Sequence, residues 1–326
     1  NNCPLLQSLD VTSSRSVTDK SIPALLNCKH LKEVKLYRTS VSADGYKELL
    51  SVLPRIQDIG RCDEFGNVLE KFREENLKTL GLKALLCRDM TIEHFNLLIK
   101  YCPNLVHISV FHDERIADLT ILSSLVHLKE LKIMNCDFFT DKVNELLRLR
   151  GDNLTWLHLE HVEEIDLHAL TLISKFCPKL KSLTLYNCEL LQHASISLSG
   201  LNYKPFFYLE RLLCVADCAL NHLEFLLTYC VNIRFIQLGS STGICDRIMY
   251  KILTANSMKY LEELKILYSQ DLSMQTVKLL MTHCTELRIL SELESWEGIS
   301  ADELKDFKEF IKTNNINLDV RPTLSY

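Results

Sequence analysis

The stretch CPKLKSLTLYNC, residues 177–188, sets three leucines three and two positions apart, directly after a cysteine and a proline. Residues 102–110, CPNLVHISV, repeat this phrase with other apolar residues in the same places. The pattern apolar-x-x-apolar-x-apolar recurs twelve times along the chain, at intervals of 21 to 29 residues. A period of this length indicates stacked copies of one structural unit. The first positions of the twelve units are Leu6, Leu31, Ile56, Leu77, Leu105, Leu128, Leu154, Leu180, Leu209, Ile233, Leu261 and Leu287.

Each unit has a strand-like half followed by a helix-like half. Residues 128–136, LKELKIMNC, alternate apolar and polar side chains, which predicts a short strand with one buried face. Residues 91–102, TIEHFNLLIKYC, place Phe95, Leu98 and Cys102 on one face of a helix. Successive strands that are joined through helices run parallel to one another. The pattern therefore predicts an α/β solenoid with a parallel sheet.

A cysteine stands three residues before the first apolar position in half of the units. Larger apolar residues replace it in most of the others, so we interpret it as the last buried residue of each helix. The proline that often follows stops the helix. Equivalent thiols in neighbouring repeats would lie roughly 8 to 10 Å apart, too far for a disulfide, so we expect free thiols. The six cysteines are Cys3, Cys28, Cys102, Cys177, Cys230 and Cys284.

Helices that end on Cys-Pro or Cys-x before LxxLxL resemble the cysteine-containing subclass of leucine-rich repeats, found in F-box proteins. The resemblance implies a leucine-rich-repeat solenoid (horseshoe), with parallel strands on the concave face and helices on the convex face. It implies one domain of about twelve repeats over residues 1–326. The polar amphipathic helix and short strand expected within residues 299–326 would form its C-terminal cap.

The same resemblance implies a function. F-box proteins are substrate receptors of cullin-RING ubiquitin ligases, so the chain would be a non-catalytic protein-binding module that recognises substrates. Those receptors carry a ligase-docking module ahead of their repeats, and no such segment is found in this sequence. Because the chain opens inside a repeat, we expect further residues upstream, through which cullin-RING components would bind. A scaffold or adaptor without a ligase, and a regulator of a small GTPase, remain alternatives.

The composition narrows the partners. The chain is 47% hydrophobic and carries a net charge of -5, which disfavours nucleic acid as a partner. No apolar run reaches the ~18 residues of a membrane span, so no membrane partner is expected. The start of the chain also lacks the pattern of a signal peptide. Thirteen cysteines without a disulfide pattern suit a reducing compartment, so we predict an intracellular protein, cytoplasmic or nuclear.

We expect the protein partner on the concave face, where the third, fifth and seventh positions of each unit meet solvent. The early units place small or charged residues there, Thr79 and Gly81 among them. The middle units place aromatic, Met and Arg side chains there, which are enriched in interface hot spots. Alternatively, these side chains only stack on one another. The predicted partner-binding residues are His107, Phe111, Met134, Trp156, His158, Glu160, Tyr186, Arg211, Leu213 and Phe235.

Motifs of catalysis are missing from the sequence, which contains no GxGxxG, HExxH or GxSxG. We therefore expect no catalytic residue, no metal site and no cofactor. His158 and Glu160 share a strand face and would suit a metal ion, but the histidines that follow fall in a turn and a helix, which favours solvated surface. Cys214 and Cys218 would suit a redox pair, but Cys214 occupies a leucine position, which favours core packing.

Overall fold

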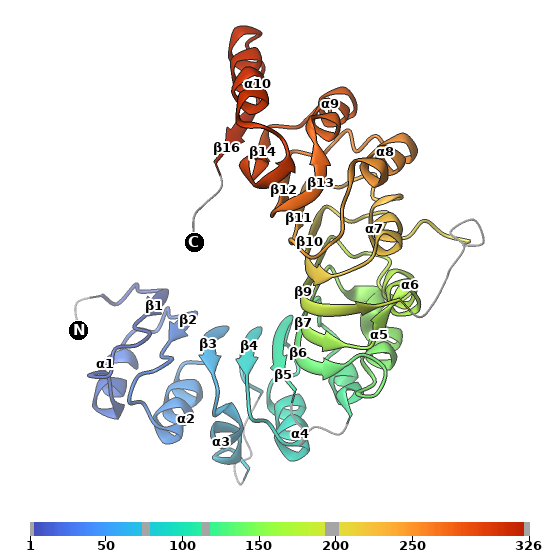
Figure 1. Cartoon of the computed structure of the whole chain (residues 1–326). Coiled ribbons are helices and arrows are strands. Elements are labelled where there is room, and N and C mark those ends of the chain that lie inside the picture. Colours follow the sequence, from blue (N-terminus) through green and yellow to red (C-terminus); the bar gives the residue numbers. More distant parts are fainter. Residues whose placement is uncertain (1–2, 74–78, 113–117, 193–201, 323–326) are drawn as a thin grey trace. The chain divides into compact units, whose positions relative to one another are not determined.

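A computed structural model describes residues 3–73, 79–112, 118–192 and 202–322 of the chain. Strands and helices alternate along these residues, and the chain divides into two compact units, Asn1–Leu154 and Thr155–Tyr326. In each unit the strands run parallel in one main sheet, and the helices cover one of its faces (Figure 1). We call the opposite face the open face of that unit.

The first unit, Asn1–Leu154, stacks its strands in sequence order, each parallel to the next. Its described strands are β1 (Ser8–Asp10), β2 (Glu33–Lys35), β3 (Asp58–Cys62), β4 (Ala84–Cys87), β5 (His107–Phe111) and β6 (Glu130–Asp137). Its described helices are η1 (Asp19–Ser21), α1 (Ile22–Leu25), α2 (Ala43–Val52), α3 (Phe65–Glu70), α4 (Ile92–Tyr101), η2 (Leu119–Ser124), α5 (Val143–Arg150) and η3 (Gly151–Asn153).

The second unit, Thr155–Tyr326, repeats this plan and adds short strands beside the main sheet. The main strands are β7 (Trp156–Glu163), β9 (Ser182–Leu191), β10 (Arg211–Asp217), β11 (Phe235–Leu238), β12 (Glu263–Ile266), β14 (Ile289–Ser291) and β16 (Asp319–Arg321). The added strands are β8 (Ile165–Asp166), β13 (Ser269–Ser273) and β15 (Trp296–Gly298). The described helices are α6 (Leu167–Phe176), α7 (Leu220–Leu227), α8 (Asp246–Ala255), α9 (Met274–His283), η5 (Leu293–Ser295) and α10 (Ala301–Thr313).

The repeat pattern fixes where each strand begins. In eleven of the twelve predicted repeats, the main strand starts two residues after the first apolar position, as Ser182 follows Leu180 at the start of β9. The fourth and sixth positions point into the core, so Leu183 and Leu185 are fully buried. Period-two alternation therefore buries one face of each strand against the helices and leaves the other face open. The predicted α/β fold with parallel strands is confirmed.

The fourth repeat is the exception, and the predicted first position Leu77 lies outside the described residues. The strand of this repeat is β4, and its first residue, Ala84, pairs with Asp58 on one side and His107 on the other. The first position is therefore Leu82, which is fully buried. The predicted register was wrong because residues 77–82 and 82–87 both satisfy the apolar pattern.

This correction moves the open-face residues of the fourth repeat. Thr79 and Gly81 precede β4 and do not face solvent from its strand, as the sequence had suggested. Their places are taken by Ala84, Leu86 and Arg88, the third, fifth and seventh positions counted from Leu82. Arg88 thereby joins the open face of the first unit.

Ten of the thirteen cysteines are buried beside the leucines of the core, whereas Cys3 is exposed and Cys28 and Cys245 are partly exposed, so the expected burial of the repeat-end cysteine fails in the first repeats. Cys102 and Cys230 are fully buried at the ends of α4 and α7, and all thirteen cysteines are free thiols. Burial raises the pKa of the thiols of Cys62, Cys87 and Cys284 to about 12. These cysteines are neutral at physiological pH and behave as small apolar side chains.

The segment predicted as a C-terminal cap contains α10 and β16. Ser300 and Glu303 form a capping box at the start of α10, and β16 pairs in parallel with β14. Leu304, Phe307 and Ile311 form the buried side of the helix. Among the described residues, no helix combines the length and apolar character that crossing a membrane requires.

Candidate protein-binding surface

The open face of the second unit brings seven predicted residues onto four adjacent strands. Trp156, Ser182, Arg211 and Phe235 are register partners along one row of β7, β9, β10 and β11. The next row runs through His158, Thr184 and Leu213, and a third pairs Glu160 with Tyr186. Strands about 4.8 Å apart make the residues of each row close neighbours.

Small residues separate the large ones in these rows. Ser182 lies between Trp156 and Arg211, and Thr184 lies between His158 and Leu213, all on the open face. The side chains of β7 and β10 therefore stand on either side of the smaller side chains of β9. Thr184 is only 8% exposed, so the larger neighbouring side chains cover it.

Contacts within β7 hold its three predicted residues together. The ring centroids of Trp156 and His158 lie 5.6 Å apart at an edge-on angle. His158 Nε2 lies 3.2 Å from Glu160 Oε2. All three side chains remain partly exposed, so they present an aromatic ring, an imidazole and a carboxylate in a fixed order along one strand.

Arg211 and Phe235 form a second contact on this face. The Arg211 guanidinium lies 3.9 Å from the centre of the Phe235 ring, within the range of a cation–π interaction. Tyr186 is 39% exposed and is the most open of the predicted aromatic residues. Together these residues offer apolar rings with charged groups beside them, which is the chemistry of protein interface hot spots.

A pocket of about 400 Å³ lies at the carboxyl ends of β9, β10 and β11. Its lining includes two exposed carboxylates, Glu189 and Asp217, which are register partners on β9 and β10. Gly239 allows the chain after β11 to approach β10, because a Cβ there would lie 3.0 Å from Val215 Cα. The pocket adds negative charge beside the aromatic rows, and the sequence prediction did not include it.

The first unit carries the other three predicted residues on its own open face. His107 Nδ1 lies 3.1 Å from Glu130 Oε2, and His107 Nε2 lies 3.0 Å from Ser109 Oγ. Phe111 and Met134 are register partners on β5 and β6. These three side chains are only partly exposed, and His107 is occupied by polar neighbours.

Two arginines on the same face were missed by the sequence prediction. Arg88 lies over the Phe111 ring at 3.9 Å, and Arg61 lies over the Tyr37 ring at 4.5 Å. Arg88 was missed through the wrong register of the fourth repeat. Arg61 takes its place through a bulge in β3 at Gly60, whose φ of 64° lies in the left-handed region. The local signal for the bulge was the sequence Asp-Ile-Gly.

The residues considered for metal or redox chemistry are placed as follows. His161 adopts a left-handed backbone conformation in β7, and His168 lies in α6. Among the described residues, no group of three or more His, Cys, Asp or Glu side chains is arranged to hold a metal ion. Cys214 is fully buried and Cys218 nearly so, and both are free thiols.

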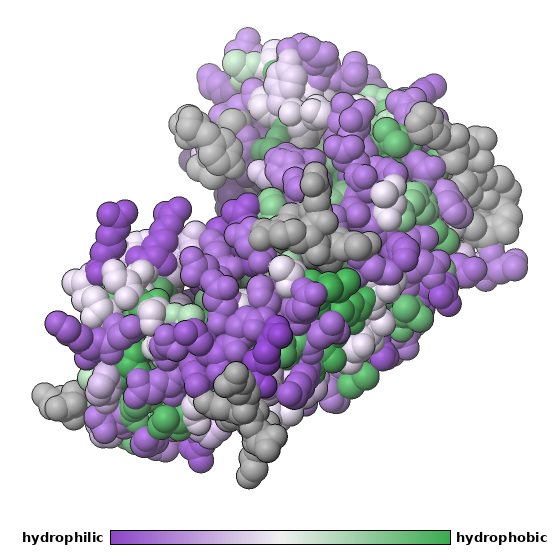
Figure 2. Space-filling view, turned by 90° about the horizontal axis from the view of Figure 1, so that it is seen from below, coloured by the Kyte–Doolittle hydropathy of each residue, from purple (hydrophilic) through white to green (hydrophobic). Residues whose placement is uncertain are grey.

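Figure 2 shows a molecular face that is mostly hydrophilic, with smaller hydrophobic areas between the polar side chains. Exposed aromatic residues also occur away from the open faces. Tyr250 on α8 is 59% exposed and Phe310 on α10 is 52% exposed. Single exposed rings of this kind are normal at protein surfaces, so the rows on the second unit stand out by their grouping and not by exposure alone.

Comparison with known proteins bears on the fold. The sequence matches no protein-family model, and no curated protein matches it. Among solved structures, a chain of the yeast Rad7 and Elc1 complex superimposes with a TM-score of 0.51 at 13% identity, over 95% of this chain and 85% of that chain.

Two further structures have lower scores. A leucine-rich-repeat protein of Leptospira interrogans has a TM-score of 0.45 at 13% identity, over 91% of this chain and 73% of that chain. A chain of a TLR13–ssRNA13 complex has a TM-score of 0.41 at 12% identity, over 94% of this chain and 56% of that chain. The parallel strands, the repeat register and the first of these likenesses together show that the chain has a leucine-rich-repeat fold.

Proposed function

We propose that the protein is a non-catalytic protein-binding module and that the open face of its second unit recognises the partner. The observation that carries this proposal is the grouping of Trp156, Tyr186, Arg211 and Phe235 on adjacent strands with small residues between them. Aromatic and Arg side chains contribute much of the binding energy of protein interfaces when surrounding contacts shield them from water. On the first unit, the proposal assigns His107, Phe111 and Met134 as partner-binding residues of that unit's own open face.

The charges on this face indicate the chemistry of the partner segment. Glu160, Glu189 and Asp217 lie on or beside the aromatic rows and would pair with basic side chains of the partner. The rings of Trp156 and Tyr186 would bind apolar or cationic groups. A segment that combines a basic residue with an apolar one matches these groups.

In its finer form, the proposal is that the partner is a substrate of a ubiquitin ligase. This part depends on the resemblance of the cysteine-containing repeats to those of F-box receptors. Cullin-RING components would then bind through another part of the complete protein. A fold accommodates many functions, so the ligase role needs a test separate from the binding role.

The binding role is tested by affinity purification with mass spectrometry, using tagged protein in cells. The Trp156→Ala, Tyr186→Ala double variant is compared with a control, Tyr250→Ala, Phe310→Ala, which removes two exposed rings from helices. We expect the first variant to lose the partners that wild type captures and the control to keep them. Equal capture by the two variants, at equal thermal stability, would contradict the proposed surface.

The same experiment tests the ligase role. Cullin-RING components in the wild-type sample, together with partners that accumulate when the protein is depleted, support the substrate-receptor function. Partners captured without any ligase component support a scaffold or adaptor instead. A captured small GTPase whose rate of GTP hydrolysis changes on binding supports the third alternative.

A further inference from the structure

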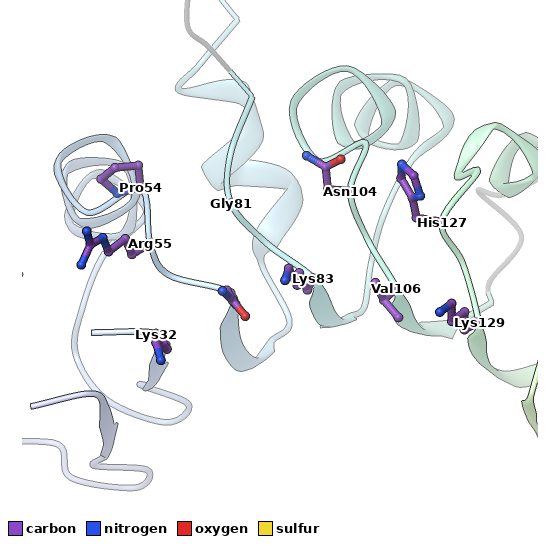
Figure 3. A pocket seen from close by; sticks show the side chains of 10 residues that line it. Lys32, Pro54, Arg55, Gly81, Lys83, Asn104, Val106, His127 and Lys129 are labelled. Atoms are coloured by element: carbon purple, nitrogen blue, oxygen red, sulfur yellow. The ribbon is translucent and has the colours of Figure 1, made fainter. Parts of the chain in front are cut away.

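A groove of about 730 Å³ runs along the edge of the first unit where its strands begin. Its lining comes from five consecutive repeats, each contributing the residue just before a strand or the turn that leads to it. Figure 3 shows Lys83, Val106 and Lys129 at the starts of neighbouring strands and Asn104 and His127 on the preceding turns. We call this feature the basic groove.

The lining of the basic groove is cationic in a protein whose net charge is -5. Lys32, Arg55, Lys83 and Lys129 line it together with His127, and no carboxylate belongs to the lining. Lys32 Nζ donates to the neutral Gln7 Oε1 at 3.0 Å. Within the described parts of the chain, neither Arg55 nor Lys83 has a carboxylate within ion-pair distance.

The nearest carboxylates in the sequence are engaged elsewhere. Glu33, Asp58 and Glu130 each follow a lining residue by one position and begin β2, β3 and β6. Glu33 accepts a hydrogen bond from Ser8 Oγ, Asp58 accepts one from the Gly60 N–H, and Glu130 lies 3.1 Å from the His107 ring nitrogen. Among the described residues, these carboxylates form no ion pair with Lys32, Arg55 or Lys83, so the charged ends of these three side chains remain available to a ligand.

The backbone carbonyls at the strand starts already accept hydrogen bonds from the next strand. The carbonyl of Lys83 accepts from the N–H groups of Val106 and His107 at 2.8 and 2.9 Å, and the carbonyl of Val106 accepts from Lys129 and Glu130 in the same way. These carbonyls are therefore already paired, and the charged side chains beside them are the stronger candidates to contact a ligand.

The groove depends on a glycine at its floor. A Cβ at Gly81 would lie 2.3 Å from the carbonyl oxygen of Pro54 and 3.0 Å from that of Ile56. Only glycine lets the chain before β4 approach the turn before β3 so closely. The lining residues of these two repeats are brought together by this contact.

We propose that the basic groove binds an extended acidic segment of a protein partner. Lys32, Lys83 and Lys129 precede alternate strands β2, β4 and β6, so their rows are about 9.6 Å apart, twice the strand spacing. Every third residue of a polyproline II segment recurs after about 9.3 Å. A segment with Asp or Glu at every third position therefore places one carboxylate beside each lysine.

The uncharged lining favours a peptide over a nucleic acid. Gln57 and Asn104 carry amides that donate and accept hydrogen bonds, which matches both the N–H and the C=O of a peptide backbone. Pro54 and Val106 supply apolar contact. No Phe, Tyr or Trp lines the groove, whereas single-stranded nucleic acids are normally held by stacking on such rings.

The proposal is tested by fluorescence anisotropy with a labelled seven-residue peptide that has Glu at positions one, four and seven. Wild type is compared with Lys32→Glu, Lys83→Glu and with a control of equal net charge, Lys20→Glu, Lys305→Glu, whose residues are exposed on helices outside the lining. We expect the groove variant to weaken binding at least tenfold and the control less than twofold. Affinity should fall as salt rises, because the contacts are ionic.

Three comparisons complete the test, with circular dichroism and thermal midpoints showing that the variants fold. A peptide with Gln in place of Glu should not bind, and a peptide with three adjacent Glu residues should bind less tightly than the spaced one. Equal binding of the Glu and Gln peptides, equal effects of the two double variants, or no binding to wild type would each overturn the proposal. A single-stranded RNA of matched charge that binds the groove more tightly would overturn it in favour of nucleic acid.

Discussion

Asp246, in the first turn of α8, accepts hydrogen bonds from the backbone N–H and the hydroxyl of Ser273, the residue that caps α9, at 3.0 and 2.6 Å. Asp19 makes the same contacts with Ser42, which caps α2. In both cases a carboxylate at the start of one helix fixes the start of the helix in the next repeat. Adjacent repeats are thus joined by capping groups as well as by the sheet and the core.

We predict that Asp246→Asn destabilises the second unit by about 1–2 kcal/mol, because the Asn side chain has one acceptor oxygen for the hydrogen bonds that Ser273 and Thr276 donate to two. Chemical denaturation at neutral pH measures this loss. Asp302→Asn, at an exposed position of α10, is the matched control and should change stability by less than 0.5 kcal/mol, about the limit for surface substitutions.

The effect of Asp246 should depend on pH. Burial raises the pKa of this carboxyl, but the hydrogen bonds from Ser273 and Thr276 outweigh burial, so its pKa is lowered overall. A lowered folded-state pKa gives stability that is present above the unfolded value, near 4, and is lost as the pH falls below it. The difference in stability between wild type and Asp246→Asn should shrink as the pH falls from 5 towards 3.

Gly81→Ala should destabilise the first unit by roughly 2 kcal/mol or more, since the added Cβ would meet two backbone oxygens that cannot move independently. Gly243→Ala is the comparison, because its Cβ would have ordinary contacts but its φ of 60° is costly for alanine. That variant should lose about 1 kcal/mol from backbone strain alone. If Gly81→Ala and Gly243→Ala lose the same free energy of unfolding, the turn must move to relieve the contacts of the Cβ added at Gly81.

His222 should make the second unit less stable in mild acid. Its side chain is fully buried, its Nδ1 accepts from the Ala219 N–H at 3.0 Å, and burial lowers its pKa. As the pH falls below about 6.5, the unfolded chain takes up a proton that the folded protein resists, so stability declines. The slope contributed by one proton is at most about 1.4 kcal/mol per pH unit.

Denaturation midpoints between pH 7.5 and pH 5 check this expectation. His222→Gln should show a smaller decline over this range than wild type, whatever its stability at pH 7.5. His30→Gln replaces an exposed histidine and should keep the wild-type slope. If both variants keep the wild-type dependence of stability on pH, titratable groups other than His222 cause that dependence.

Trp296→Phe should cost about 1–3 kcal/mol. The indole is almost fully buried, and its Nε1–H donates to the Ile266 carbonyl at 3.1 Å, so phenylalanine leaves that oxygen without its donor. Trp296→Ala should cost more, about 3–5 kcal/mol, because it also opens a cavity. Because the chain has two tryptophans, Trp296→Phe leaves Trp156 as the single tryptophan, and with excitation selective for tryptophan a change in its emission would report a ligand on the open face of the second unit.

The strands and their exposed positions were predictable because they follow from period-two alternation, which is a local property of the sequence. This is why Trp156, Tyr186 and Arg211 lie on the open face as predicted. The register of β4 was not predictable from the apolar pattern alone, because two overlapping segments satisfy it. The pairing of Ala84 with Asp58 and His107 decides between them, and pairing is a tertiary property.

The basic groove was not foreseen for a similar reason. Its lysines occupy the second position of the repeat, which the pattern leaves free to vary, and they come together only because strands 25 or so residues apart in sequence are neighbours in space. The bulge that exposes Arg61 likewise depends on the partner strand. The groove could have been found by comparing the second positions across repeats, whereas Arg61 is the sixth residue of its repeat and reaches the open face only through the bulge.

The buried thiols near the helix ends can report local unfolding, because solvent reaches them only when the surrounding structure opens. Each repeat rests mainly on its neighbours, so a solenoid can come apart one turn at a time and need not open all at once. Cys102 in one unit and Cys230 in the other become reachable only when the surrounding turn opens. The rates at which an alkylating reagent modifies each cysteine would give the order in which the repeats unfold, with no engineered labelling site.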